Sequence, residues 1–233
     1  MGIELFFYRP HFGPQIGQPN NCALRSEDGR GYPTGMRGQR LRDGDVRQAA
    51  YGRLLSHARA CPDTLVIDEL GLDHGASRID IAVINGHIRG LEIKAEADTL
   101  ERLPRQVAAY SEVVDKASLI VAPRHLDGAM AIIPDWWGII VADRGTRQGV
   151  IFNRVRPERA NRAVNPLVLA RLLWRPEVQR ILEGIGVPKR DLRAPREDLY
   201  QRLVTELPAR QLAYEVRTAL KTRSIWRGPP PPL

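Results

Sequence analysis

The sequence predicts an α/β fold in which helices flank a mixed sheet and a helical module follows. Two observations carry this prediction. Between residues 44 and 160, short segments rich in β-branched residues alternate with segments whose apolar residues recur at helical spacing. From Asn165 onward the apolar spacing is helical throughout, and Asn165-Pro166 has the residue types typical of a helix start.

The first elements follow in order along the chain. Residues 1–43 are rich in Gly, Pro and Asn without a sustained apolar period, so we expect a flexible leader. Residues 45–60 carry an apolar helical face, which Pro62 ends. Apolar and β-branched residues then predict strands over 64–70, 77–84 and 87–95, with Asn85-Gly86 as the turn of a hairpin.

The remaining helices and strands, from residue 98 to residue 223, are predicted from capping residues and from apolar spacing. Asp98, with Glu101 three residues on, predicts the capping box of a helix, and an apolar strand follows at 119–121. The remaining predicted elements are a short helix at 126–133, strands at 137–142 and 149–154, and helices from 165, over 195–206 and over 208–223. The expected domains are a leader (1–43), a core (44–160), a basic helical module (161–226) and a Pro-rich tail (227–233).

The charge is unevenly distributed. From Asp143 to the end there are 19 Lys/Arg and 9 Asp/Glu, a net charge of +10, so residues 1–142 hold a net −2 of the total +8. This distribution favours a polyanionic partner, namely nucleic acid, although an Arg-rich solvated surface is the plain alternative. Two cysteines without metal-ligand spacing, no targeting segment and no long apolar run favour the cytoplasm and exclude a membrane span.

Polar residues interrupt two of the predicted strands. Glu92 and Lys94 point to one side of their strand, opposite Leu91 and Ile93, because side chains alternate along a strand. A two-residue hairpin loop would place Asp80 opposite Leu91, away from Glu92, whereas a loop of odd length or a bulge restores a common face. A shared site therefore requires the odd loop; a salt bridge on a solvated sheet surface is the alternative.

These residues resemble the PD-(D/E)XK nuclease superfamily. The similarity rests on R-I-D at 78–80, L-E-I-K at 91–94, the helix R-L-P-R-Q-V-A-A-Y at 102–110 and D-W-W-G at 135–138. It covers about residues 45–142, and it is closest to a little-characterised bacterial branch. The resemblance implies a restriction-endonuclease-like sheet in the core.

The resemblance also implies a metal site. Asp80 and Glu92 would bind Mg²⁺, for which Mn²⁺ can substitute. For a further acidic ligand, Glu69 at the end of the first strand competes with Asp45 in the first helix, and we favour Glu69.

The same resemblance assigns roles to neighbouring side chains. Lys94 would activate the attacking water or stabilise charge on the phosphate, and Gln106 would orient water or phosphate. The residues expected to contact substrate are Tyr110, Arg78, Arg102 and Arg105.

The resulting expectation is a metal-dependent nuclease that hydrolyses phosphodiester bonds, with DNA favoured over RNA as substrate, in repair or phage defence. Endonuclease and exonuclease action both stay open. Its alternative is a catalytically silent protein of nuclease fold that binds nucleic acid. A homodimer and a targeting protein partner both stay open.

Overall fold

The computed structural model describes residues 40–72, 75–145 and 149–223, all within one unit of chain, Gln39–Leu233. Most of the predicted leader and all of the Pro-rich tail lie outside these residues. The strands are β1 (Leu65–Leu72), β2 (Ser77–Ile84), β3 (Ile88–Lys94), β4 (Lys116–Val121), β5 (Gly138–Arg144) and β6 (Val150–Arg156). The helices of the core are α1 (Asp43–Arg53), α2 (Ser56–Ala60), α3 (Leu103–Ser111), η2 (Pro123–His125) and α4 (Leu126–Met130). The C-terminal helices are α5 (Pro166–Ala170), α6 (Arg175–Gly184), η3 (Asp191–Arg193), α7 (Arg196–Glu206) and α8 (Ala209–Thr222).

The six strands form one mixed sheet in sequence order. The pairs β1–β2, β2–β3 and β5–β6 are antiparallel, whereas β3–β4 and β4–β5 are parallel. Helix α3 provides the crossover between β3 and β4, as parallel neighbours require. The predicted α/β class, with a mixed sheet flanked by helices and C-terminal helices after it, is confirmed.

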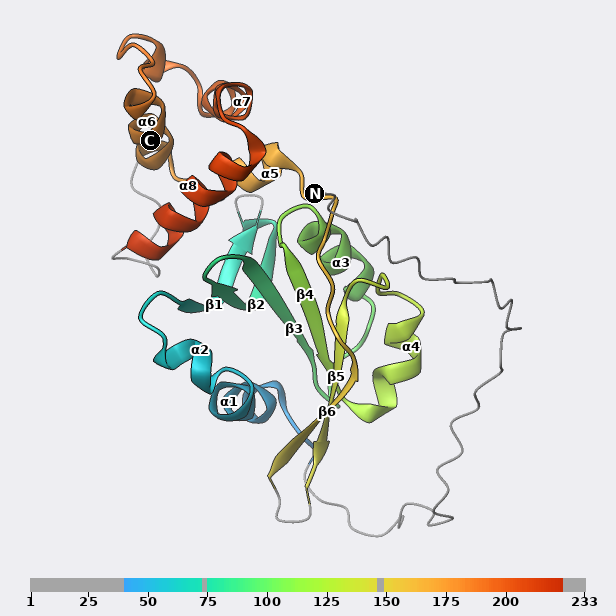
Figure 1. Cartoon of the computed structure of the whole chain (residues 1–233). Coiled ribbons are helices and arrows are strands. Elements are labelled where there is room, and N and C mark those ends of the chain that lie inside the picture. The colour runs from blue at the N-terminus through green and yellow to red at the C-terminus, as the bar shows by residue number, and fades with distance from the viewer. Residues whose placement is uncertain (1–39, 73–74, 146–148, 224–233) are drawn as a thin grey trace, which may run out of the picture. The chain divides into compact units, whose positions relative to one another are not determined.

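Helices cover both faces of the sheet (Figure 1). On the α1–α2 face, Val46 and Leu55 pack in one apolar cluster with Leu91 and Ile93 of β3. On the α3–α4 face, a larger cluster contains buried residues of α3, β4 and β5, Trp137 among them. The alternation along β3 therefore directs Glu92 and Lys94 towards the α3 face, because Leu91 and Ile93 occupy the other.

The C-terminal helices continue the larger apolar cluster. Leu70 and Leu72 of β1 belong to the same cluster as Leu212, Val216 and Leu220 of α8. The amphipathic face of α8 thus buries against the sheet and against α5 and α7. Among the described residues, no helix combines the length and the apolar character needed to cross a membrane.

The β2–β3 hairpin has the odd-length loop that a shared site requires. Ile84 pairs with Ile88, which leaves a three-residue loop, and the ladder ends at the pair Ile81 and Leu91. One residue further along both strands, Asp80 and Glu92 come next to each other. The structure thus has the odd number of loop residues that a shared site for Asp80 and Glu92 requires.

Two helix boundaries differ from the prediction. The helix expected over 45–60 is divided into α1 and α2 at Leu54 and Leu55. Helix α3 begins at Leu103 rather than at Asp98, because Pro104 belongs to its first turn. Asp98 instead closes a turn in which its carboxylate accepts a 2.7 Å hydrogen bond from the backbone N–H of Ala95.

Candidate functional site

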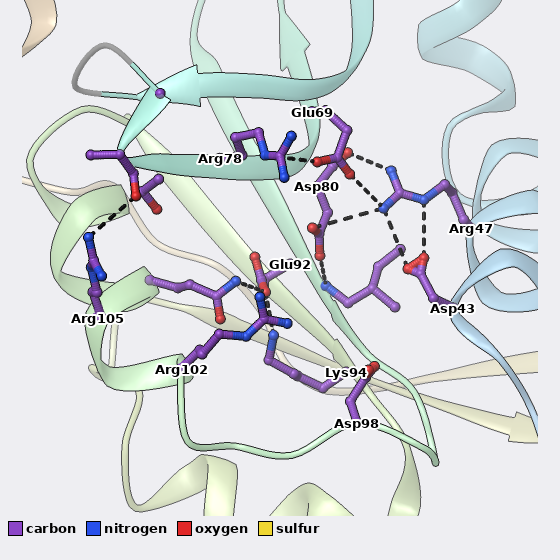
Figure 2. A pocket seen from close by; sticks show the side chains of 15 residues that line it. Asp43, Arg47, Glu69, Arg78, Asp80, Glu92, Lys94, Asp98, Arg102 and Arg105 are labelled. Atoms are coloured by element: carbon purple, nitrogen blue, oxygen red, sulfur yellow. Dashed lines mark hydrogen bonds and ion pairs between the residues drawn. The ribbon is translucent and has the colours of Figure 1, made fainter.

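A pocket of about 560 Å³ opens where β2 and β3 separate, between α1 and the start of α3 (Figure 2). Its lining is unusually rich in charge and contains most of the residues predicted from sequence. The lining residues are Asp43, Arg47, Glu69, Gly75, Ala76, Ser77, Arg78, Asp80, Glu92, Ile93, Lys94, Asp98, Arg102, Arg105 and Gln106.

Asp80 lies where the ladder between β2 and β3 stops. Its Oδ2 accepts a 2.8 Å hydrogen bond from the backbone N–H of Ile93. Ile93 lies beyond the last β2–β3 pair, Ile81 with Leu91, so the side chain of Asp80 replaces a backbone partner there. Its Oδ1 is 3.9 Å from Nη2 of Arg47. Burial, and after it the negative charge of Glu92, raise the pKa of Asp80 to about 7.

Glu92 is fully buried, and three side chains hold it. Lys94 Nζ and Gln106 Nε2 each lie 2.5 Å from its Oε1, and the Tyr110 hydroxyl donates to its Oε2. Burial, and after it the charge of Glu92, raise the pKa of Tyr110 well above its ordinary value, so the hydroxyl keeps its proton. The Glu92–Lys94 pair is therefore an interior ion pair and not a salt bridge on a solvated sheet surface.

Gln106 contributes an unusual atom to the pocket. Its amide nitrogen binds Glu92, but its Oε1 is buried with no hydrogen-bond partner among the described residues. A buried acceptor without a donor is costly, and such atoms are commonly satisfied by a ligand or an ordered water.

Arg47 organises the α1 side of the pocket. It reaches from α1 to two strands: its Nη1 donates to Asp68 at 3.0 Å and to the carbonyl of Asp80 at 2.7 Å, and its Nη2 lies 3.2 Å from Glu69. Burial lowers the pKa of Arg47, but the hydrogen bonds and charges of Asp43, Asp68 and Asp80 together outweigh this and keep it above its ordinary value.

The other predicted residues take different places. Glu69 lines the pocket, but its side chain is about half exposed and pairs with Arg47 and Arg78. Its rival Asp45 lies outside the pocket and accepts from the backbone N–H of Arg42. Tyr110 lies beneath the pocket rather than on its wall, so it holds Glu92 and has no surface for a substrate.

The rim on the α3 side is basic. Arg102, Arg105 and Arg78 all line the pocket, as predicted for residues that contact an anionic ligand. The guanidinium group of Arg102 has no hydrogen bond or ion pair with any residue that the structure describes, and that of Arg105 makes one long contact, 3.4 Å, with the carbonyl of Ala76. Their donors are thus available.

Sequence reasoning missed Asp43 and Arg47. Their spacing of four residues on a helix is a known signal for an ion pair, and it was visible in D-G-D-V-R. What the sequence did not indicate is that α1 would turn this pair towards β1 and β2.

The donor set fits a divalent cation of the Mg²⁺ type. Asp80 and Glu92 supply carboxylate oxygens, the class of ligand that Mg²⁺ prefers. No group of three or more His, Cys, Asp or Glu suited to a metal occurs among the described residues. Mg²⁺ tolerates this, because it commonly binds one or two carboxylates and keeps several waters.

Comparison with known proteins assigns the chain to a family. The family model for bacteriophage P4 protein cII matches residues 39–226. Protein cII of Enterobacteria phage P4 is 24% identical over 162 residues, which cover 69% of this chain and 60% of that relative. The chain thus spans less than two-thirds of the relative's length. No solved structure matches the chain significantly.

This match corrects the sequence-based assignment. The resemblance to PD-(D/E)XK nucleases rested on a few residues within 45–142, whereas the family model extends over most of the chain and names a different family. The predicted nuclease activity, its silent alternative and the suggested roles in repair or phage defence are therefore wrong, since each depended on that resemblance. The chain belongs to the bacteriophage P4 protein cII family.

Proposed function

We propose that this protein binds DNA through a divalent-cation site, with Mg²⁺ held by Asp80 and Glu92 and backbone phosphates held by the arginine rim. One observation carries the proposal: the fully buried carboxylate of Glu92 and the half-buried carboxylate of Asp80 share a pocket whose outer wall is arginine. A cation between carboxylates and phosphate would compensate both, since each is an oxygen anion.

The metal part of the proposal rests on the electrostatics of Asp80. Two carboxylates that repel each other in a buried place gain most from a positive ion. Asp80 Oδ1 is the less engaged oxygen, because its one ion-pair partner among the described residues, Arg47, lies 3.9 Å away. Both oxygens of Glu92 already accept hydrogen bonds, so Glu92 would reach the ion through a remaining lone pair or a bound water.

The nucleic-acid part rests on charge and available donors. Arg102 and Arg105 flank the start of α3 and face the pocket beside Gln106 (Figure 2). Guanidinium groups match phosphate oxygens in geometry and charge. The net charge of +10 from Asp143 to the end would add affinity that does not depend on base sequence.

The cation site is tested by thermal unfolding and by Mn²⁺ binding, read from the electron paramagnetic resonance of free Mn²⁺. We expect Mg²⁺ and Mn²⁺ to raise the unfolding temperature of the wild type, and Asp80→Asn to abolish both the shift and the bound Mn²⁺. Asp127→Asn is the control, because Asp127 is an exposed carboxylate of α4 outside the pocket. Equal Mn²⁺ binding by wild type and Asp80→Asn would refute the site.

DNA binding is tested by fluorescence anisotropy with a labelled 20-base-pair duplex, in Mg²⁺ and in EDTA. Arg102→Gln and Arg105→Gln should each weaken binding about tenfold in Mg²⁺, as the loss of a charged hydrogen bond implies. Arg180→Gln, an exposed arginine of α6 outside the pocket, should have a much smaller effect. Equal losses in all three variants would mean that charge alone, and not this pocket, binds DNA.

We also propose the cytoplasm as the site of action. Cys61 is an exposed free thiol, which suits a reducing compartment. A homodimer and a protein partner stay predictions that a sizing column coupled to light scattering would test.

A further inference from the structure

A second cavity lies at the opposite end of β2 from the first pocket. Ser77 and Arg78 at the start of β2 line the first pocket, whereas Gly86, just beyond its end, lines the second. This cleft has a volume of about 430 Å³ and lies where the β2–β3 turn meets α5 and α8. Small-ligand pockets commonly fall in this range, roughly 300–1,000 Å³.

Three arginines line this cleft: Arg162, Arg210 and Arg217. None of their guanidinium groups has a hydrogen bond or ion pair with any residue in the described ranges. The only carboxylate of the cleft is Asp115, whose Oδ2 accepts a 2.7 Å hydrogen bond from the backbone N–H of Ile88. Three guanidinium groups against one carboxylate leave two positive charges without a counterpart among the described residues that line the cleft.

The arginines are carried on well-anchored segments. Arg210 and Arg217 are seven residues apart on α8, so they project from nearly the same side of the helix, and Ala213 between them leaves the space open. Arg162 follows Asn161, whose side-chain amide donates to the carbonyls of Ser111 and Val114 at 2.7 and 2.9 Å. The helix and the loop that carry the three arginines are thus fixed in the fold.

The rest of the lining is apolar. Val164 and Pro166 are half-buried and Leu169 and Leu212 are buried, and all four line the cleft beside the arginines. A ligand that suits both parts has an anionic end and a flat, weakly polar body. A phosphate monoester carries about −1.5 to −2 at neutral pH, which matches the two uncompensated charges better than the single charge of a carboxylate or a phosphodiester.

We propose that this cleft binds a nucleotide bearing a terminal phosphate, with the phosphate against Arg162, Arg210 and Arg217 and the base against Val164 and Pro166. The same chemistry is presented by a free mononucleotide and by the 5′-phosphorylated end of a strand. The site is independent of the proposed cation pocket, because the two share no lining residue.

Calorimetric titration of the full chain in EDTA tests the proposal with four probes: AMP, adenosine, and a single-stranded dodecamer with and without a 5′-phosphate. We expect AMP or the phosphorylated dodecamer to bind at least tenfold more tightly than its unphosphorylated counterpart. Binding of AMP alone would identify a free nucleotide, and binding of the phosphorylated dodecamer alone a strand end; either supports the site. No preference for phosphate on either scaffold would overturn it.

Three variants place the binding in the cleft. Arg210→Gln and Arg217→Gln should each weaken it about tenfold, and Ala213→Trp should block it by filling the space while leaving every charge in place. Arg180→Gln, in the same helical module but outside the cleft, should bind as the wild type does. Wild-type binding by both arginine variants, or an equal loss in Arg180→Gln, would refute the assignment even if Ala213→Trp did not fold.

The two sites are separated by one further titration. Asp80→Asn should keep AMP or strand-end binding in EDTA, whatever the fate of Mg²⁺-dependent duplex binding. Loss of nucleotide binding in Asp80→Asn, with its unfolding temperature unchanged, would contradict an independent cleft.

Discussion

Asp80 is the residue whose ionisation the fold opposes most clearly. Burial and the charge of Glu92 raise its pKa from 3.8 to about 7, so the folded protein holds this proton more tightly than the unfolded chain does. The stability that protonated Asp80 contributes is complete below pH ~3.8 and is lost as the pH rises through about 7. Alkaline buffers without divalent cations therefore leave a buried charge that costs folding free energy.

Because ionised Asp80 destabilises the fold as the pH rises, Asp80→Asn should be the more stable form at high pH. Between pH 5 and pH 8, urea unfolding without divalent cations should show the variant gaining about 2–3 kcal/mol over the wild type, because asparagine cannot ionise. The amide oxygen can still accept from Ile93, so the local fold should persist. Asp127→Asn should show no such trend, and a difference independent of pH would mean that Asp80 is not buried in its charged form.

Tyr110 gives a second prediction at this scale. Tyr110→Phe removes the hydroxyl that donates to Oε2 of Glu92 and leaves a buried carboxylate with one donor fewer. We expect a loss of about 1–3 kcal/mol in the free energy of unfolding. Tyr214→Phe is the control, since Tyr214 is exposed, and denaturant titrations that found equal losses would contradict the role assigned to Tyr110.

Single residues also mark the limit of sequence reasoning. Glu92 and Lys94 could be placed on one face because strand periodicity alone decides it. Arg47 could not be placed, since its contacts with Asp68 and Asp80 cross 21 and 33 residues and depend on where α1 packs. The sequence did not indicate that Tyr110 would be buried. Gln106 and Tyr110 share a helix face, but only Gln106 reaches the pocket.

At the scale of elements, β3 and α3 fit closely because β3 carries a glycine. A Cβ added at Gly90 would meet the ring of Tyr110 at 3.1 and 3.2 Å. Gly90→Ala should therefore push Tyr110 away from Glu92 and destabilise the fold by roughly 1–3 kcal/mol. Gly86→Ala, where an added Cβ meets nothing within 4 Å, should cost much less when the two unfolding curves are compared.

Elements were predicted well where the signal was local. Alternation identified the strands, and it required a β2–β3 loop of odd length if Asp80 and Glu92 were to share a face, as the strand pairing shows. Helix boundaries were predicted less well where two signals favoured different start residues. Asp98 was expected to cap α3, but the helix begins at Leu103, because Pro104 favours the first turn. The division at Leu54 and Leu55 follows Gly52 in the last turn of α1, where glycine weakens a helix, and Leu55 is buried against the sheet.

At the scale of the whole molecule, a short motif can indicate one family while the match over most of the chain indicates another. The pattern R-I-D…L-E-I-K specifies two carboxylates and a lysine on neighbouring strands, and the structure does bring them together. The same three side chains can serve as a buried ion-pair network in a chain of another family, because burial requires such charges to be paired whatever their use. The geometry was thus predictable from the motif, whereas membership followed from the match over residues 39–226.

The C-terminal helices are held together by a buried ion pair next to the apolar cluster that they share with the sheet. Arg223, just after α8, lies 2.6 Å from Glu177 of α6 and stacks on Trp174 with 4.4 Å between guanidinium and ring. Both side chains of the ion pair are largely buried, so removing one partner leaves an unpaired charge and should cost about 3–5 kcal/mol. Arg223→Gln is expected to show this loss, and Arg180→Gln is not.

Because one apolar cluster runs from the sheet into α8, this loss should not stay within the helices. Hydrogen exchange under conditions of global opening should show the amides of β4 and of α8 losing protection together in Arg223→Gln. Protection lost from α8 while β4 exchanges as in the wild type would mean that the helices open as a separate unit. Coupled loss would mean that a ligand bound in the cleft beside α8 stabilises the sheet as well, since the two unfold as one.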